Sequence, residues 1–328
     1  MSNVARREFL EMAAGLVASL RLGSRWFAGD AEDTAGSKAA GVQPAPVSGD
    51  PVPEAALALQ SLAEGAAPVV WLQGLSCTGC SVSFLNAAYP DAATVLTRYA
   101  NVDFHSTLST GAGRLAMATL DRRVEAGGYI LVVEGAVPLG MPAACELGGE
   151  DFGSLLTRVA RGATAIVVLG TCAAFGGIPA APPNPTGAVA VPRALNGSGV
   201  KAPTISLPGC PIHPDWLVGT LVQLLRFGMP TLNKQGCPEQ FYGNLIHARC
   251  PEFYNYNMGR FAKFFGDSGC LFNLGCLGIR TYADCSTRRW NGKTNWCVES
   301  GAPCVGCARP EFAQDRTFPF YRVREQTA

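Results

Sequence analysis

The sequence predicts an α/β protein in which a doubly wound parallel sheet is followed by an irregular, cysteine-rich domain. From residue 68 onward, short continuous apolar runs alternate with helical segments, as expected for strands that are buried on both faces of a parallel sheet. In the last part of the chain the alternation stops, and Gly, Asn, aromatic residues and Cys become frequent. A chain of 328 residues is long enough for two domains. We predict these domains over residues 68–235 and 236–328.

Residues 1–45 are predicted to form an export signal and its linker. An Arg6–Arg7 pair precedes a short, weakly apolar run over residues 12–20. This pattern is typical of a twin-arginine signal, which exports proteins that fold around cofactors before they cross the membrane. Cleavage is expected within residues 28–45. The alternative is an amphipathic helix that stays on the chain.

Residues 46–67 are predicted to be a second stretch of linker, because they are rich in Ala, Pro and Gly. The chain contains no run of twenty apolar residues, which a membrane-spanning helix would need. Any contact with a membrane would therefore come through a partner.

The composition excludes some classes of protein. A net charge of +1 and only 16% charged residues argue against a nucleic-acid-binding protein. Thirteen cysteines are many for an ordinary enzyme, and an odd number in uneven groups fits a disulfide framework poorly. Metal binding is the better explanation for most of them.

The sheet is predicted from four apolar runs that end in Gly- or Pro-containing turns. These runs comprise residues 69–72, 129–133, 165–169 and 204–207. A helix is expected over residues 81–89, and another over 214–227, where Pro214 lies in the first turn and its missing N–H costs nothing.

Four cysteines follow these predicted strands directly: Cys77, Cys80, Cys172 and Cys210. In an open α/β sheet they would meet at the carboxyl edge, where ligands bind. Each has another explanation, because a lone Cys-x-x-Cys can be a redox dithiol and a lone Cys is usually a small buried apolar residue. Their shared placement favours a metal or cluster site.

Eight further soft-metal ligands lie within about sixty residues near the end of the chain. In chain order they form two sets of four, namely His247, Cys250, Cys270 and Cys276, then Cys285, Cys297, Cys304 and Cys307. Four N/S ligands can hold either one tetrahedral zinc ion or one cubane iron–sulfur cluster. Neither set has the two close pairs of a zinc ribbon, so the spacing favours clusters. The segment lacks hydrophobic periodicity, and metal is expected to do much of its folding.

Together these motifs resemble the small, electron-transferring subunit of nickel-iron hydrogenases. The resemblance covers residues 69–321. The motifs that carry it are CTGC at 77–80, VEG at 133–135, GTCAAFGG at 170–177, PPNPT at 182–186, PGCP at 208–211, HARC at 247–250, the two Gly-Cys pairs at 269–270 and 275–276, and APCVGC at 302–307.

The resemblance implies a flavodoxin-like domain followed by an iron–sulfur cluster-binding domain with three clusters. The proximal set of ligands would be Cys77, Cys80, Cys172 and Cys210. The distal set would be His247, Cys250, Cys270 and Cys276. The medial set would be Cys285, Cys304 and Cys307, with Cys297 as the fourth ligand. All three clusters are then predicted to be 4Fe-4S, and the medial one 3Fe-4S if Cys297 is not a ligand.

The sequence departs from the family pattern in three places. Many members have Pro where this chain has Cys297, and they carry a 3Fe-4S medial cluster. Oxygen-tolerant relatives have extra cysteines where this chain has Gly79 and Gly177, so an ordinary proximal cluster is expected. Many members have Glu where this chain has Ser76 and Ser106, so a proton route through those acids is not implied.

The remaining candidate residues are given structural roles. His213 is expected to pack or to cap a helix near the proximal set, and His105 to be structural or to face a partner. Cys145 and Cys237 are expected to be buried free thiols. Glu134 ends a strand at the functional edge, and its role stays open between hydrogen bonding and contact with a partner.

The resemblance implies the small subunit of an exported uptake hydrogenase, in the periplasm or on the outer face of the cytoplasmic membrane. Electrons from dihydrogen oxidation at the nickel-iron centre of a separate large subunit would pass through three clusters to a cytochrome or a quinone-linked membrane protein. No catalytic residue is expected in this chain, nor any nucleic-acid partner, and heterodimers could assemble further. The alternatives are a regulatory hydrogen sensor and a zinc-stabilised scaffold.

Overall fold

The computed structural model describes residues 66–109 and 111–313, all of which belong to one compact unit. The predicted twin-arginine signal, the linker up to residue 65 and the motif residues beyond 313 lie outside the described residues. The domain boundary at residues 235 and 236 stays a prediction. Within the described part of the chain, no helix combines the length and the apolar character needed to cross a membrane.

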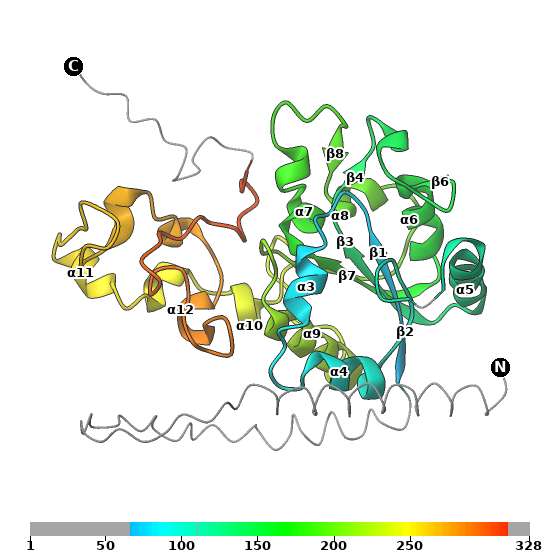
Figure 1. Ribbon diagram of the computed structural model, residues 1–328, viewed down its shortest axis with the longest axis horizontal. Helices are drawn as coiled ribbons and strands as arrows, with labels where there is room; N and C mark the ends of the chain where they lie inside the picture. Colours follow the sequence, from blue (N-terminus) through cyan, green and yellow to red (C-terminus); the bar gives the residue numbers. More distant parts are fainter. Residues whose placement is uncertain (1–65, 110, 314–328) are drawn as a thin grey trace, which may run out of the picture. The chain divides into compact units, whose positions relative to one another are not determined.

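A parallel sheet of five strands forms the first part of the structure (Figure 1). Its strands are β1 (Ala67–Gln73), β2 (Ala100–His105), β3 (Tyr129–Glu134), β7 (Ala163–Leu169) and β9 (Thr204–Leu207). They are ordered β2-β1-β3-β7-β9 and each neighbouring pair is parallel. The first strand thus lies in the sheet interior, and the chain then extends to one edge and afterwards to the other, which is the flavodoxin-like order. The predicted fold class is confirmed.

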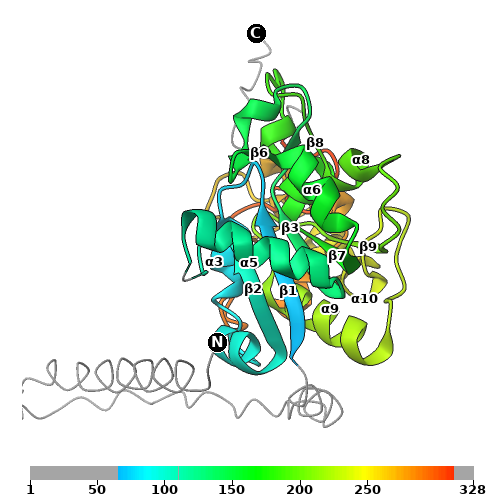
Figure 2. The same ribbon diagram turned by 90° about the vertical axis from the view of Figure 1, so that its right-hand side faces the viewer.

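Both faces of the sheet are covered, because alternate strand residues point to opposite sides. Val69, Ile130 and Val167 pack in one apolar cluster with residues of α9 (Pro214–Phe227). Val70 and Leu131 pack in a second cluster with residues of α5 (Gly113–Ala126) and α6 (Phe152–Ala160). Figures 1 and 2 show α5 and α6 on one side of the sheet and α9 on the other.

The four predicted strands and the predicted helix over 214–227 are confirmed, but two elements differ. The expected helix over 81–89 is the shorter α3 (Gly79–Phe84), because residues 88–91 turn back in an antiparallel bridge around Pro90, which has no N–H for a helix. The edge strand β2 was not predicted. Its polar residues Asn101 and Asp103 interrupt the apolar run that marks the buried strands.

Short elements connect the main ones. Between β1 and β7 these are α4 (Ala92–Thr94), a π-helical turn (Val95–Tyr99), a 3-10 turn (Pro142–Ala144) and the small strands β4 (Val137–Pro138), β5 (Glu146–Leu147) and β6 (Glu150–Asp151). After β7 they are α7 (Gly170–Phe175), a 3-10 turn (Ile178–Ala180), β8 (Ala188–Val189) and α8 (Val191–Leu195). β4 pairs with β8 and β5 with β6, both antiparallel.

The chain after α9 is irregular, as predicted. Its elements are α10 (Glu239–Tyr242), α11 (Phe253–Asn257), α12 (Cys285–Arg288) and the 3-10 turns Ile246–Arg249, Leu271–Leu274 and Gly278–Arg280. No helix here exceeds five residues between 228 and 313, a range that the structure describes throughout. Such short helices are not stable alone in water.

Hydrogen bonds fasten this irregular segment to α9 and to the loop that follows β9. The Trp216 indole N–H donates to Asp284 at 2.8 Å, and the Tyr242 hydroxyl donates to the Pro208 carbonyl at 2.9 Å. The cysteine-rich segment is therefore held against α9 and the loop that follows β9.

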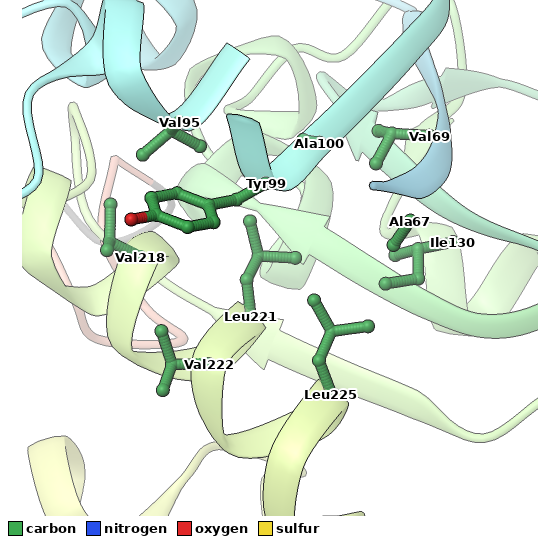
Figure 3. Close-up of a pocket in the computed structure, with 10 residues that line it drawn as sticks. All are labelled: Ala67, Val69, Val95, Tyr99, Ala100, Ile130, Val218, Leu221, Val222 and Leu225. Atoms are coloured by element: carbon green, nitrogen blue, oxygen red, sulfur yellow. The ribbon is translucent and has the colours of Figure 1, made fainter. Parts of the chain in front are cut away.

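A small apolar cavity of about 20 Å³ lies at the opposite, amino end of the strands. Figure 3 shows Tyr99 above Leu221 and Val218 of α9, with Val69 and Ile130 at the sheet side. No cysteine and no charged residue lines it. We interpret it as a packing gap, remote from the predicted ligands.

Candidate metal centres

The Cys-x-x-Cys turn after β1 brings two predicted proximal ligands against the sheet. Thr78 has a left-handed φ of 62°, and α3 starts at the next residue, so Cys80 lies in its first turn. A Cβ on Gly170 would come within 2.5 Å of the Cys80 sulfur. Gly170, at the end of β7, therefore allows the β7 loop to approach Cys80 closely.

Cys172 and Cys210 join them from two other loops. Gly177 has a φ of 48°, and a Cβ there would lie 2.9 Å from the Cys172 backbone nitrogen, so the chain folds tightly over Cys172. The Thr171 N–H donates to the Gly209 carbonyl at 2.9 Å, and the Gly209 N–H donates to the Thr171 hydroxyl at 2.8 Å. These two bonds hold the loops with Cys172 and Cys210 side by side.

The four proximal cysteines lie near enough to one another to affect pKa values within the set. Burial, the Glu134 carboxylate and the Cys172 and Cys210 thiols raise the pKa of Cys80. Burial raises the pKa of Cys210 to about 12, with further contributions from Cys172 and Cys77. The structure thus brings all four predicted residues together. Thiols in such an environment stay neutral until a metal displaces the proton.

Glu134 anchors this site through hydrogen bonds that the sequence did not reveal. The side chain is 2% exposed. Its Oε1 accepts from the Ser76 hydroxyl at 2.8 Å and from the Cys80 N–H at 3.1 Å. Its Oε2 accepts from the Ser81 hydroxyl at 2.6 Å and from the Ser81 N–H at 3.2 Å. Glu134 therefore fixes the Cys-x-x-Cys turn to the end of β3.

The two histidines near this site have structural contacts. His105 is buried, its Nε2 lies 3.3 Å from the Ser81 hydroxyl, and its ring packs against Trp71. Burial lowers the pKa of His105. His213 caps α9 by accepting from the Asp215 N–H at 3.1 Å, which confirms the predicted capping role.

The four predicted distal ligands line a single cavity. This cavity is bordered by His247, Cys250, Cys270, Cys276, Glu252, Phe272, Trp296 and neighbouring aliphatic residues. Burial raises the pKa of Cys250 to about 11, with smaller contributions from Cys276 and Cys270. Burial also lowers the pKa of His247, which keeps its ring neutral and able to bind a metal.

The four predicted medial ligands line a second cavity, of about 330 Å³. Its border includes Cys285, Cys297, Cys304, Cys307, Trp290, Trp296 and the proximal residue Cys210. Burial first, and then the Cys307 and Cys304 thiols, raise the pKa of Cys285, while a hydrogen bond from the Trp290 side chain opposes this. Cys297 is exposed, yet it borders this cavity and not the distal one.

Hydrogen bonds also cross between the three sets. Burial raises the pKa of the Cys307 thiol to about 11, and a hydrogen bond from the Cys210 backbone lowers it in part. The Thr171 hydroxyl donates to the Cys307 carbonyl. The Cys304 N–H donates to the Cys276 sulfur over 3.4 Å. Neighbouring sets are therefore in direct contact.

The donor sets suit clusters of several atoms. Among the described residues, no group of three or more His, Cys, Asp or Glu side chains is placed to hold a metal ion. The distal and medial candidate ligands each line a cavity, and four N/S ligands around a space fit a cubane cluster. In addition, the Trp296 side chain is 2% exposed, borders both cavities and has no partner for its indole N–H. Cluster sulfur would offer the missing acceptor.

The remaining cysteines lie apart from these sites. Cys237 is buried and Cys145 is half-buried, and neither borders the two cavities. Burial raises the pKa of Cys237 to about 12 and also raises that of Cys145. The prediction of a buried free thiol is therefore confirmed for Cys237, whereas Cys145 is free but only half-buried.

Two protein families match the sequence. Residues 77–224 match the family described as NADH ubiquinone oxidoreductase, 20 Kd subunit. Residues 242–321 match the family described as the C-terminal part of the NiFe/NiFeSe hydrogenase small subunit.

Individual relatives match over most of their length. The periplasmic [NiFeSe] hydrogenase small subunit of Desulfomicrobium baculatum is 39% identical over 80% of this chain and 90% of its own. The uptake hydrogenase small subunit of Azotobacter vinelandii is 37% identical over 76% of this chain and 72% of its own. A crystal structure of the reduced, active Ni-Fe-Se hydrogenase from Desulfomicrobium baculatum contains a chain with 40% identity and a TM-score of 0.75, and the match covers 78% of this chain and 98% of that one.

Proposed function

The chain belongs to the family of NiFe and NiFeSe hydrogenase small subunits and is therefore a subunit of such an enzyme complex, and from this membership we propose that it carries electrons from dihydrogen oxidation to an external acceptor. The complex implies a large subunit as partner. We place the nickel-iron centre in that subunit. This chain would supply the electron path and no catalytic residue.

The proposal assigns each set of ligands to one iron–sulfur cluster. The proximal cluster would be held by Cys77, Cys80, Cys172 and Cys210, the distal cluster by His247, Cys250, Cys270 and Cys276, and the medial cluster by Cys285, Cys297, Cys304 and Cys307. When bound, these clusters would supply one-electron redox chemistry with little change in geometry. The observation that supports the proposal is that the twelve predicted ligand residues fall into three groups, with contacts between neighbouring groups.

The residues of this chain would set the exposure to water, the ligand positions and the redox potential of each site. Burial removes water from the sulfurs, which the raised pKa values of Cys80, Cys250 and Cys285 reflect. Glu134 holds the Cys-x-x-Cys turn in register with the sheet. Hydrogen bonds to sulfur, burial and ligand charge are the means by which a protein tunes cluster potential.

Metal analysis of the co-purified complex tests the proposal. Three cubanes predict about twelve irons per small subunit and negligible zinc. The visible absorption of the complex should bleach when dihydrogen is added and return with an oxidised viologen dye. Stoichiometric zinc with little iron would instead establish the zinc-stabilised scaffold.

The relatives named periplasmic support export of this chain. We propose that the Arg6–Arg7 pair directs export by the twin-arginine route and that the acceptor is a cytochrome or a quinone-linked membrane protein. Replacing both arginines by lysine should leave the subunit in the cytoplasm, as measured by cell fractionation. Undiminished export of the double variant would contradict this.

A further inference from the structure

We infer that Trp296, which is not one of the twelve predicted ligands, donates its indole N–H to a sulfur of the medial or the distal cluster and thereby raises the potential of that cluster. This inference rests on the proposed function. It adds a residue outside the three ligand sets that adjusts the difference in potential between two neighbouring sites.

Trp296 lies between the medial and distal cavities. Two of the described residues border both cavities, namely Ile246 and Trp296. Both are almost completely buried, with 3% and 2% of their surfaces exposed. We refer to these two residues as the shared wall. Any group that the wall presents to a cavity therefore acts on one of two neighbouring ligand sets.

The indole N–H is the polar group of the shared wall that lacks a partner. The Ile246 N–H donates to the Thr281 carbonyl at 2.9 Å, and the Ile246 carbonyl accepts from the Ser286 hydroxyl at 3.4 Å. The Trp296 carbonyl accepts from the Ser300 N–H at 3.0 Å. The Trp296 indole nitrogen, in contrast, is shielded from water and has no acceptor among the described residues. A buried donor without an acceptor costs free energy and so requires an explanation.

The chemistry of the two cavities supplies the missing acceptor. Each cavity is lined by four predicted cluster ligands, so a bound cluster would bring inorganic sulfide and thiolate sulfur, which carry negative charge. The indole of Trp296 has one N–H donor and no acceptor. It can therefore contribute to a bound cluster in only one way, which is as a donor to sulfur.

This donation has a definite electrostatic consequence. The reduced state of a cluster carries one more negative charge than the oxidised state, so an N–H that donates to sulfur stabilises the reduced state and raises the potential. Because the indole has a single N–H, it acts on one of the two sites. Trp296 therefore changes the difference in potential between the medial and distal sites.

The experiment compares the complete wild-type complex with Trp296→Phe, which keeps an aromatic ring and removes the N–H. Both are produced with ¹⁵N-labelled tryptophan, and pulsed electron paramagnetic resonance spectra are recorded at potentials that make the medial and the distal cluster paramagnetic in turn. The wild type should show a ¹⁵N coupling that Trp296→Phe loses. The cluster whose spectrum changes identifies the acceptor as medial or distal.

A redox titration of the same cluster signals gives the second measurement. The potential of the cluster that loses the coupling should shift to a more negative value in Trp296→Phe. Each potential is read from the signal of a loaded cluster, so a partly loaded preparation still reports it.

Trp71→Phe is the matched control. Trp71 is 3% exposed and its indole N–H also lacks a partner, but it borders neither cavity. This variant should keep the ¹⁵N coupling and the medial and distal potentials of the wild type.

Wild-type spectra of the medial and distal clusters without any ¹⁵N coupling would overturn the inference, and this result needs no variant. Wild-type couplings or wild-type potentials for both clusters in Trp296→Phe would also overturn it. These results leave the proposed function intact. A wild-type complex without iron, or one whose spectrum ignores dihydrogen, would instead remove the proposed function itself.

Discussion

Trp290 is a residue that should tune one cluster. Its side chain borders the medial cavity and lowers the pKa of Cys285, against the larger rise that burial causes, and its ring packs against His213 at 4.7 Å and Trp216 at 6.1 Å between centroids. The sequence placed Cys285 in the medial set but gave no sign of this donor, because the contact depends on the tertiary fold.

Replacing Trp290 by Phe should lower the medial potential, because the indole N–H, which favours the ionised form of Cys285, would be lost. A redox titration of the complex measures this shift. Trp71→Phe is a suitable control, since Trp71 is a buried tryptophan whose indole N–H has no partner. Equal potentials in Trp290→Phe and the wild type would contradict the assignment.

Under the proposed assignment, Cys297 would decide the type of the medial cluster. It borders the medial cavity, although it is more exposed than the other three members of the set. Replacing it by Pro should convert the cluster to a three-iron form, with a new electron paramagnetic resonance signal in the oxidised state and one iron fewer per subunit. Cys145→Ser should change neither quantity. A spectrum unaffected by Cys297→Pro would remove Cys297 from the ligand set.

At the scale of elements, α9 depends on a histidine cap in one protonation state. His213 Nδ1 accepts from the Asp215 N–H, so its Nε2 must carry the proton that is donated to the Arg289 carbonyl at 2.6 Å. A second proton on Nδ1 would face the Asp215 N–H. Burial lowers the pKa of His213, although Arg289 and Asp215 oppose this in part.

This cap predicts a pH dependence of stability. Because the folded-state pKa lies below the ordinary value of about 6.5, the unfolded chain binds the proton first, and stability falls as the pH drops below about 6.5. His213→Asn keeps a side chain that caps helices well and removes the titration. Thermal unfolding of the complex from pH 7.5 to 5 should therefore decline less in this variant. If the variant and the wild type lose thermal stability equally as the pH falls, titration of His213 does not contribute to the pH dependence of stability.

The elements differ in how well the sequence predicted them. The inner strands β1, β3 and β7 and the second edge strand β9 are largely continuous apolar runs, so their burial is visible locally. The edge strand β2 mixes Asn101 and Asp103 with apolar residues, and its pairing depends on β1. The start of α3 could not be predicted from the sequence. Its first turn is held by hydrogen bonds to Glu134, which lies far away along the chain.

The ligand groups were predictable because their chemistry repeats along the chain, whereas the contacts between groups were not. Residues that share a set follow one another or follow successive strands. The bonds from Thr171 to Cys307 and from Cys304 to Cys276 join sequence-distant segments, and no local pattern marks them.

At the scale of the whole molecule, the sheet and the cysteine-rich segment should differ in their need for iron. The sheet has its own two-sided apolar core, while the segment after α9 contains only short helices. We expect removal of iron to open the segment over residues 245–307 and to leave β3 and β7 protected. Amide hydrogen exchange by mass spectrometry, with and without iron, measures this. Equal protection of the segment in both forms would refute a folding role for metal.

The bond between Thr171 and Cys307 also limits how early during synthesis the fold can be completed. Once β9 and the loop after it have emerged from the ribosome, the three loops that carry the four proximal cysteines are available. The segment that covers them has not yet emerged. Domains fold as they leave the ribosome, starting from the amino terminus. The sheet can therefore form early, while the proximal ligands stay open to the machinery that inserts iron and sulfide. Closure must wait until residue 307 has been translated, so the order of synthesis leaves an interval in which the innermost cofactor can be loaded.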